Sequence, residues 1–167
     1  GGDRVVRSDV LDIDPANPTA SITADLSRAD GLPSETYDCV ILTQTLNVIY
    51  DVRGALRHVV RLLRPGGVLL CTVSALNRIS YEGRGLDGDF WRFTEASLRR
   101  LLAEQLPVES FTVAGFGNVL ACTAFLNGLA MHELTEAELD HRDPYFPLVY
   151  GVRAVKPLIR ALEDHDA

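Results

Sequence analysis

Two apolar runs of strand length, separated by one amphipathic helix, constrain the fold of this chain most. The runs are Tyr37–Thr43 (YDCVILT) and residues 67–73 (GVLLCTV). Nearly continuous apolar runs of this length are typical of strands buried on both faces of a parallel sheet. Between them, apolar residues recur at helical spacing after Asp51, a predicted N-cap, and a Pro-Gly-Gly sequence follows. Strand, helix and strand in this order predict a right-handed crossover and an α/β fold.

Patterning and capping signals predict further elements on both sides of this unit. We expect strands at residues 4–14 and 21–24, a helix at 94–105, a strand nearer the sheet edge at 108–114, a buried helix at 118–131, a short acidic turn at 135–139, and a last strand within 145–155 that begins no earlier than Leu148 or lies at an edge.

Charge and hydropathy exclude several classes of partner. Sixteen Lys and Arg residues against 23 Asp and Glu residues give a net charge of −7, which disfavours binding to a nucleic-acid backbone. No apolar run approaches the roughly 20 residues of a membrane-spanning helix. We therefore expect a soluble, cytoplasmic protein with no membrane or nucleic-acid partner.

The cysteines and histidines show no cluster at metal-ligand spacing, so we expect no metal site. Cys39, Cys71 and Cys122 are odd in number and widely spaced, which predicts buried thiols in a reducing compartment. His58 lies on the charged side of the helix that follows Asp51, where we expect it to be exposed to solvent.

In an open parallel sheet, ligands bind beyond the carboxyl ends of the strands. There a carboxylate can accept hydrogen bonds from ribose hydroxyls, and Asp12 or Asp14 suits this role. Asp25, one strand further on, could accept from an adenine amine while Leu26 covers the ring. The alternative is local: Asp14 caps the turn at Pro15, and Asp25 begins a polar loop.

The segments VLDIDP, ADL, YDCVILTQTL, LLRPGG and VLLCTV resemble class I S-adenosylmethionine-dependent methyltransferases. The resemblance covers residues 5–156, and the segments around YDCVILTQTL and LLRPGGVLL are its most specific part. TQTLNVIYDVRGALR, DFWRFT and GNVLACTAFLNGLA are similar to bacterial methyltransferase domains found near glycosyltransferases.

This resemblance implies a Rossmann-like, mostly parallel sheet with late antiparallel strands and a helical insertion between them. It also implies S-adenosylmethionine as cofactor, with Asp12 at the ribose and Asp25 with Leu26 at the adenine. Thr43, Gln44 and Thr45 would line the wall near the methionine part of the cofactor.

The family's first strand and Gly-rich turn have no counterpart in residues 1–167, which we expect to form a single but N-terminally incomplete domain. In the family that strand lies between the strands that end at Asp12 and Thr43. Without it, two strands would expose unpaired backbone groups. We expect residues upstream of Gly1, a second copy of the chain or a partner chain to supply it.

Methyl transfer from a sulfonium requires alignment and, for a hydroxyl acceptor, a base. His141 is the candidate base, although a loop histidine without a role is the common alternative. The Gly-rich segment 74–89 has the length of a lid over the acceptor. Trp91 and Arg92 follow it and could bind a flat sugar or aromatic acceptor and an anion. The alternative is that Trp91 and Phe93 anchor the next helix to the core.

We therefore expect methyl transfer to the hydroxyl or carboxyl group of a small molecule, with a sugar as one candidate. One alternative is a non-catalytic interaction module with a methyltransferase-like fold, or a partial chain that is inactive alone. A nucleotide-binding dehydrogenase is disfavoured because the chain contains no dinucleotide fingerprint.

Overall fold

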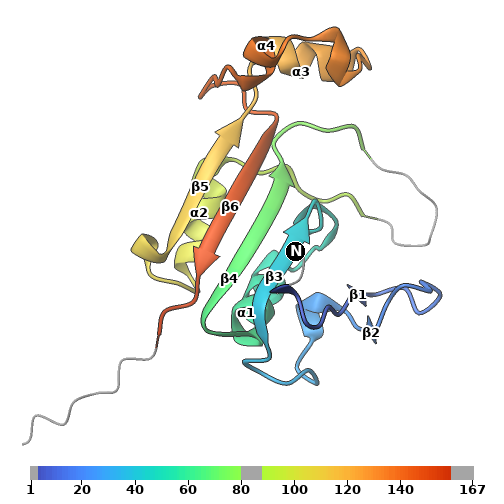
Figure 1. Ribbon diagram of the computed structural model, residues 1–167, viewed down its shortest axis with the longest axis vertical. Helices are drawn as coiled ribbons and strands as arrows, with labels where there is room; N and C mark the ends of the chain where they lie inside the picture. Colours follow the sequence, from blue (N-terminus) through green and yellow to red (C-terminus); the bar gives the residue numbers. More distant parts are fainter. Residues whose placement is uncertain (1–3, 80–87, 159–167) are drawn as a thin grey trace, which may run out of the picture.

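Four strands form the main sheet in the order β3 (Tyr37–Thr43), β4 (Leu63–Ser74), β6 (Val149–Val155) and β5 (Phe111–Phe116). The computed structural model describes residues 4–79 and 88–158. Strand β3 is parallel to β4, and β6 is antiparallel to both of its neighbours (Figure 1). The carboxyl ends of β3, β4 and β5 therefore lie at the same edge of the sheet. These strands confirm the predicted α/β fold with late antiparallel strands.

A second, two-stranded parallel sheet joins β1 (Leu11–Asp12) to β2 (Ile22–Thr23). The predicted strands at 4–14 and 21–24 are thus much shorter than expected, because only two residues of each strand are paired: Leu11 with Ile22, and Asp12 with Thr23. Among the described residues, β3 is paired with β4 on one side and with no strand on the other. The described chain consequently has an open backbone edge between β1 and β3.

Helices α1 (Val52–Leu62) and α2 (Glu95–Ala103) pack on one face of the main sheet (Figure 1). Asp51 accepts a hydrogen bond from the Gly54 amide and caps α1 as predicted, while Thr94 and Ser97 form a capping box at α2. Gly54 has no room for a side chain: a Cβ there would lie 2.8 Å from the Ser27 carbonyl oxygen. This close approach seats α1 against η2 (Leu26–Arg28).

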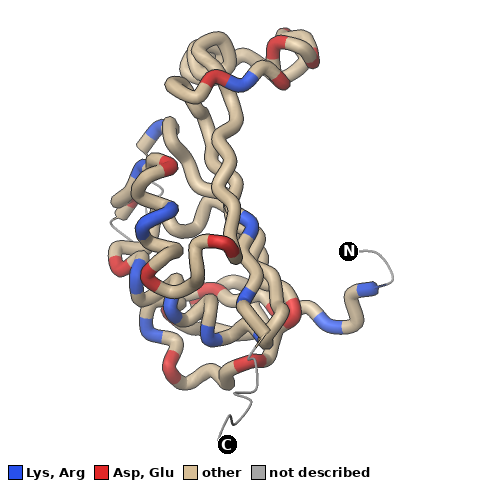
Figure 2. The backbone as a smooth tube through the Cα atoms, turned by 90° about the vertical axis from the view of Figure 1, so that its left-hand side faces the viewer, with Lys and Arg blue, Asp and Glu red and all other residues tan. Residues whose placement is uncertain are grey.

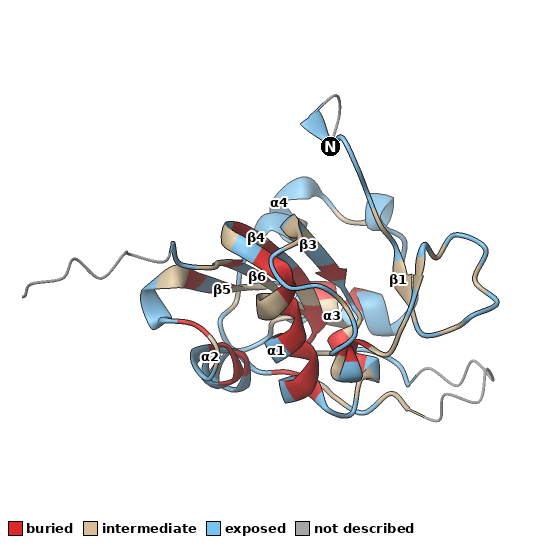
Figure 3. Cartoon of the chain, turned by 90° about the horizontal axis from the view of Figure 1, so that it is seen from below, coloured by how far each residue is buried: buried red, intermediate tan, exposed pale blue. Residues whose placement is uncertain are grey.

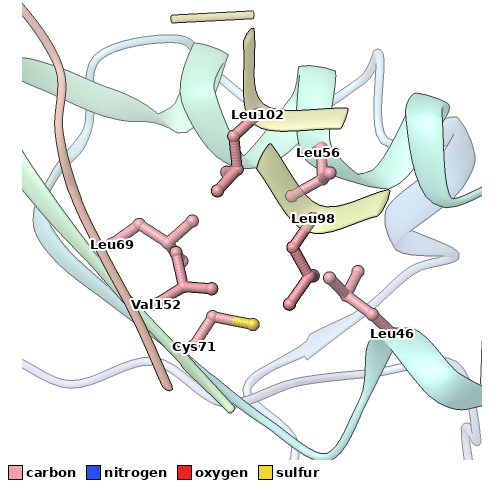
Figure 4. A pocket seen from close by; sticks show the side chains of 7 residues that line it. All are labelled: Leu46, Leu56, Leu69, Cys71, Leu98, Leu102 and Val152. Atoms are coloured by element: carbon pink, nitrogen blue, oxygen red, sulfur yellow. The ribbon is translucent and has the colours of Figure 1, made fainter. Parts of the chain in front are cut away.

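The core lies between these helices and the sheet, where buried positions concentrate (Figure 3). Side chains from α1, α2, η3 (Leu46–Val48), β4 and β6 point toward one centre (Figure 4). They leave a void of only about 10 Å³, so the packing is close; the lining residues are Leu46, Leu56, Leu69, Cys71, Leu98, Leu102 and Val152. Burial raises the pKa of the Cys71 thiol to about 12.

The opposite face of the main sheet carries no helix among the described residues. Its side chains include Cys39, Ile41 and Leu70, and Ile41 is 69% exposed. The expectation that the strand at 37–43 is buried on both faces, with Cys39 inside, is therefore wrong for the described chain. Cys71 is buried as predicted, and Cys122 is partly buried.

His58 is also placed differently from the sequence-based expectation, since only 1% of it is exposed. The segment after η2 packs against the polar side of α1, where the Arg61 guanidinium donates to the carbonyls of Ala29 and Leu32. This segment covers His58. Helical periodicity alone could not show that a loop packs on that side.

An insertion projects from the β5–β6 hairpin beyond the carboxyl edge of the sheet (Figure 1). It contains α3 (Val119–Leu126), η5 (Met131–Glu133) and α4 (Glu136–Asp140). Asn118 caps α3, but only Ala121 and Ala124 of the helix are buried, so the predicted buried helix at 118–131 is shorter and mostly exposed.

The last two strands begin later than the sequence predicts or at its limit. Residues Val108–Ser110, where a strand was predicted to start, form the 3₁₀ turn η4, and β5 follows at the sheet edge as predicted. Strand β6 begins at Val149, after the predicted limit of Leu148.

Within the described ranges, every helix is too short or too polar to cross a bilayer.

Candidate functional site

The carboxyl end of β3 holds a strained residue. Gln44 has φ +52, a left-handed backbone conformation that is uncommon for a residue with a side chain. Its amide donates to the Thr72 carbonyl at 2.8 Å, its Nε2 donates to Thr72 Oγ1 at 3.3 Å, and its Oε1 accepts from Ser74 Oγ at 2.5 Å. These bonds to β4 hold the strained backbone in place. Strain of this kind concentrates at functional sites.

Thr43 and Thr45 flank this residue, and both are exposed or partly exposed. The Thr45 hydroxyl donates to the Thr43 carbonyl at 3.0 Å. The structure therefore places the three predicted residues in one tight turn at the carboxyl edge.

Asp12 and Asp25 end the two strands of the small sheet. Asp12 is paired with Thr23, two residues before Asp25, so both acids lie at the carboxyl edge of this sheet. The Asp12 carboxylate accepts from the Asp14 amide at 2.9 Å and from Asn17 Nδ2 at 2.5 Å. Asp12 thus organises the turn after β1.

Asp25 caps η2 through one carboxylate oxygen. Its Oδ1 accepts from the Ser27 amide at 2.8 Å and from the Ser27 hydroxyl at 2.7 Å. The hydroxyl bond holds the pKa of the Asp25 carboxyl below its usual range, and burial opposes the shift. Asp25 is therefore ionised at neutral pH, with buried Leu26 beside it.

Asn47 follows the strained turn and is buried. Its carbonyl accepts from the amides of Phe90 and Trp91, and its Nδ2 donates to the Trp91 carbonyl at 3.1 Å. Its Oδ1 is buried and has no hydrogen-bond partner among residues 4–79 and 88–158. A buried acceptor without a donor is costly, so this oxygen is available to a donor on a ligand or a bound water.

Trp91 is anchored to the same turn. Its Nε1 donates to the Ile49 carbonyl at 2.9 Å, and its ring stacks on Tyr50 with centroids 6.0 Å apart. Phe90 meets the Tyr50 ring edge-on at 5.3 Å. Because Tyr50 and Phe90 are exposed, the three rings form an aromatic surface, although the Trp91 indole itself also serves as an anchor.

Arg92 is engaged within the chain. Its guanidinium makes a bidentate ion pair with Asp89 at 2.5 and 2.8 Å and donates to the carbonyls of Asn77 and Arg78. These bonds favour a structural role for Arg92 over binding of a free anion. Residues 80–87 of the predicted lid lie outside the described residues.

His141 ends α4 on the insertion, with an exposed side chain. Its carbonyl accepts from Asn118 Nδ2 at 2.7 Å, and the same amide donates to the Glu138 carbonyl at 2.8 Å. Asn118 is buried and fixes the return path of the insertion. Sequence reasoning did not assign Asn47 or Asn118 to the site, because only the folded chain shows which polar groups are buried.

Paired residues at the ends of β4, β6 and β5 connect the base of the insertion to the carboxyl edge of the main sheet. Ser74 at the end of β4 pairs with Val149 of β6, and Val149 pairs with Phe116 at the end of β5. Ser74 and Phe116 thus lie in one row across the sheet, and Gln44, which follows the Thr43–Thr72 pair, lies one residue away from this row. At about 4.8 Å between strands, Gln44 and Phe116 are separated by about 14 Å.

This strand order and this row of residues at the carboxyl edge define a class I methyltransferase fold. The "Methyltransferase domain" family matches residues 6–71, less than half of the chain. Polyketide synthase ThaG of Burkholderia thailandensis is 33% identical over 72 residues, which are 42% of this chain and 1% of that protein.

Solved structures share the fold at low sequence identity. An S-adenosylmethionine-dependent methyltransferase from Mesorhizobium loti has a TM-score of 0.52 and 20% identity over 87% of this chain and 78% of that one. A methyltransferase from Methanosarcina mazei has a TM-score of 0.51 and 14% identity over 89% and 81%. The [4+2]-cyclase SpnF has a TM-score of 0.50 and 19% identity over 81% of this chain and 55% of that one. These matches support S-adenosylmethionine as the cofactor.

Proposed function

We propose that this domain transfers a methyl group from S-adenosylmethionine to the hydroxyl or carboxyl group of a small molecule, with a sugar as one candidate. The observation that carries the proposal is the strained Gln44, held by Thr72 and Ser74 at the carboxyl edge of a methyltransferase-type sheet. The fold alone does not specify a reaction, because function depends on the side chains of the site.

The side chains at the ends of β1, β2 and β3 have the chemistry that the cofactor requires. Asp12 would accept from the ribose hydroxyls, and Asp25 from the adenine amine, through the oxygen that does not bind Ser27. Leu26 would cover the ring, and Thr43, Gln44 and Thr45 would contact the methionine part. When bound, S-adenosylmethionine supplies a methyl group on a positively charged sulfur.

We further propose that a strand outside residues 1–167 completes the sheet between β1 and β3. The open edge of β3, with Cys39 and Ile41 exposed beside it, supports this proposal. Unpaired backbone groups on an apolar strand promote aggregation, so a neighbouring strand would remove a liability. The strand belongs to a preceding segment of the same chain, a second copy or a partner chain.

The acceptor would bind between the aromatic surface and the insertion. Trp91 with its neighbours Tyr50 and Phe90 offers a flat apolar face for a sugar or aromatic ring. His141 would take the proton from an acceptor hydroxyl, since it lies on the insertion at the same edge as Gln44. The free thiols at Cys39, Cys71 and Cys122 fit a reducing compartment, and we place the protein in the cytoplasm.

Calorimetry with S-adenosylhomocysteine, using the natural full-length protein, tests the proposed function. Asp25→Asn keeps a residue able to cap η2 but removes the charge, and we expect about tenfold weaker binding. Asp38→Asn, at an exposed position at the other end of β3, is the control and should bind like wild type. Failure of the full-length wild type to bind would favour the interaction module.

A further inference from the structure

The insertion and the end of β5 line an open cavity of about 310 Å³ at the carboxyl edge of the sheet. Its lining residues are Phe116, Gly117, Leu139, Asp140 and Arg142. This volume lies at the lower end of the range for small-molecule sites. Neither Asp140 nor Arg142 was selected by sequence reasoning, because their placement depends on how the insertion returns to the sheet.

The backbone around this cavity is fixed by hydrogen bonds. Gly117 has φ +115, and a Cβ there would lie 2.8 Å from the Leu148 amide nitrogen, so only glycine fits. The Gly117 carbonyl accepts from the Asp143 amide at 2.9 Å, and Asn118 Nδ2 holds the carbonyls of Glu138 and His141. These bonds bracket Asp140 and Arg142 and hold their backbone against the end of β5.

Arg142 stacks on Phe116, with its guanidinium carbon 4.3 Å from the ring centroid. The stacking fixes the plane of the guanidinium while leaving its N–H donors at the edge. Among residues 4–79 and 88–158, neither Arg142 nor Asp140 has an ion-pair partner, and the two do not pair with each other. The cavity thus presents one positive and one negative group, both available to a ligand.

Electrostatics select among the ligands that could use these groups. Arg142 is the only Lys or Arg in the insertion, which also carries Glu133, Glu136, Glu138, Asp140 and Asp143; Figure 2 shows these acidic positions at the top of the molecule. A ligand with only an anionic group would meet repulsion from these carboxylates, and a purely cationic ligand would be repelled by Arg142. A ligand that carries both charges satisfies each side chain.

We propose that this cavity binds the zwitterionic head of a small molecule, with Arg142 holding its carboxylate or phosphate and Asp140 holding its ammonium group. If the proposed function holds, this molecule is the methyl acceptor. The three strand spacings between the end of β5 and the end of β3 then predict an elongated acceptor whose reacting atom lies roughly 14 Å from the head.

The test is a nuclear magnetic resonance titration of the full-length protein, following the amides of Gly117 and Asp143 and the side-chain amide of Asn118. The probes are glycine and γ-aminobutyrate, which carry both charges, and acetate and methylammonium, which carry one each. We expect at least one zwitterion to bind about tenfold more tightly than either singly charged probe. Acetate binding as tightly as the zwitterions, or no shifts with any probe, would overturn the proposal.

Two variants separate the two charges. Arg142→Ala and Asp140→Asn should each weaken zwitterion binding about tenfold, while Arg100→Ala on α2 and Glu136→Gln at the start of α4 should leave it unchanged. All four side chains are exposed, so the fold should persist. Zwitterion binding that survives both cavity substitutions would also contradict the assignment.

Calorimetry with S-adenosylhomocysteine on the same samples distinguishes this inference from the proposed function. If the protein binds the cofactor but no zwitterion, the proposed methyltransferase function is supported and the zwitterion site is contradicted. If the protein binds a zwitterion but not the cofactor, the site is supported and its role in binding a methyl acceptor is contradicted.

Discussion

The hydroxyl of Tyr37, the first residue of β3, donates a hydrogen bond to the carboxylate of Asp9, which precedes β1, at 3.1 Å. The two strands therefore begin side by side, although no backbone hydrogen bond joins them in the described chain. Burial and the neighbouring Asp9 carboxylate raise the pKa of the Tyr37 hydroxyl. This side-chain bond links the small sheet to the main sheet across the open edge.

Tyr37→Phe should loosen the small sheet without disturbing the main one. Loss of this bond costs about 1 kcal/mol, so hydrogen exchange of the Ile22 and Ala24 amides should accelerate about fivefold. Amides of the β3–β4 ladder, such as that of Leu70, should exchange as before. Tyr50→Phe, which changes an exposed tyrosine outside this contact, is the control; equal acceleration in both variants would contradict the link.

Gln44 should tolerate glycine better than alanine. Both substitutions remove the bonds to Thr72 and Ser74, but only glycine adopts φ +52 without strain, which favours it by about 1 kcal/mol. Urea denaturation of Gln44→Gly and Gln44→Ala measures this difference. Thr43 lies in regular strand, so there the alanine variant should be more stable than the glycine variant. If alanine were the more stable substitution at both positions, Gln44 would not be strained.

Leu98→Ala should strongly destabilise the domain. Leu98 is 2% exposed and points into a core with a residual void of about 10 Å³ (Figure 4), so truncation leaves a new cavity. We expect a loss of about 2 to 5 kcal/mol in the free energy of unfolding. Leu126→Ala, at a 66% exposed position on α3, should change it by less than about 0.5 kcal/mol. Similar losses at both positions would contradict the placement of α3 outside the core.

His58 should make stability depend on pH below neutrality. Burial lowers the pKa of this imidazole in the folded chain; Asp30 opposes the shift, and Arg61 and Arg57 reinforce it. As pH falls below about 6.5, the unfolded chain binds a proton at His58 that the folded chain does not, so the free energy of unfolding should decrease. Chemical denaturation from pH 7 to 5 measures the slope.

The control for this prediction compares two histidines. His58→Gln should flatten the slope, whereas His132→Gln, at an exposed position on the insertion, should retain it. A slope that persists without His58 would assign the pH dependence to other groups.

Much of the fold follows from local sequence signals. The apolar run at Tyr37–Thr43, the cap at Asp51 and the cap at Thr94 predict β3, α1 and α2, because each depends on periodicity or on a nearby hydrogen bond. His58 and α3 could not be placed in this way. His58 is buried by a loop distant in sequence, and α3 is apolar on all sides yet lies on a projecting insertion.

The candidate site follows the same division. The positions of Asp12, Asp25 and Gln44 after strands could be predicted because each follows an apolar run of strand type, and their roles at the cofactor stay a prediction. Asn118 and Arg142 were not, since their roles depend on hydrogen bonds and stacking between β5 and the end of α4. The bonds of Arg92 to Asp89 likewise depend on the path of the chain after β4.

The junction at Phe116 and Val149 bears on how such domains diversify. The two residues face each other across the hairpin, and the Leu148 amide donates to the Phe116 carbonyl at 2.8 Å. The intervening segment therefore leaves and rejoins the sheet at adjacent backbone positions. Evolution or an engineer can therefore replace this segment and alter which molecules are recognised, while the sheet and its two packed helices stay the same.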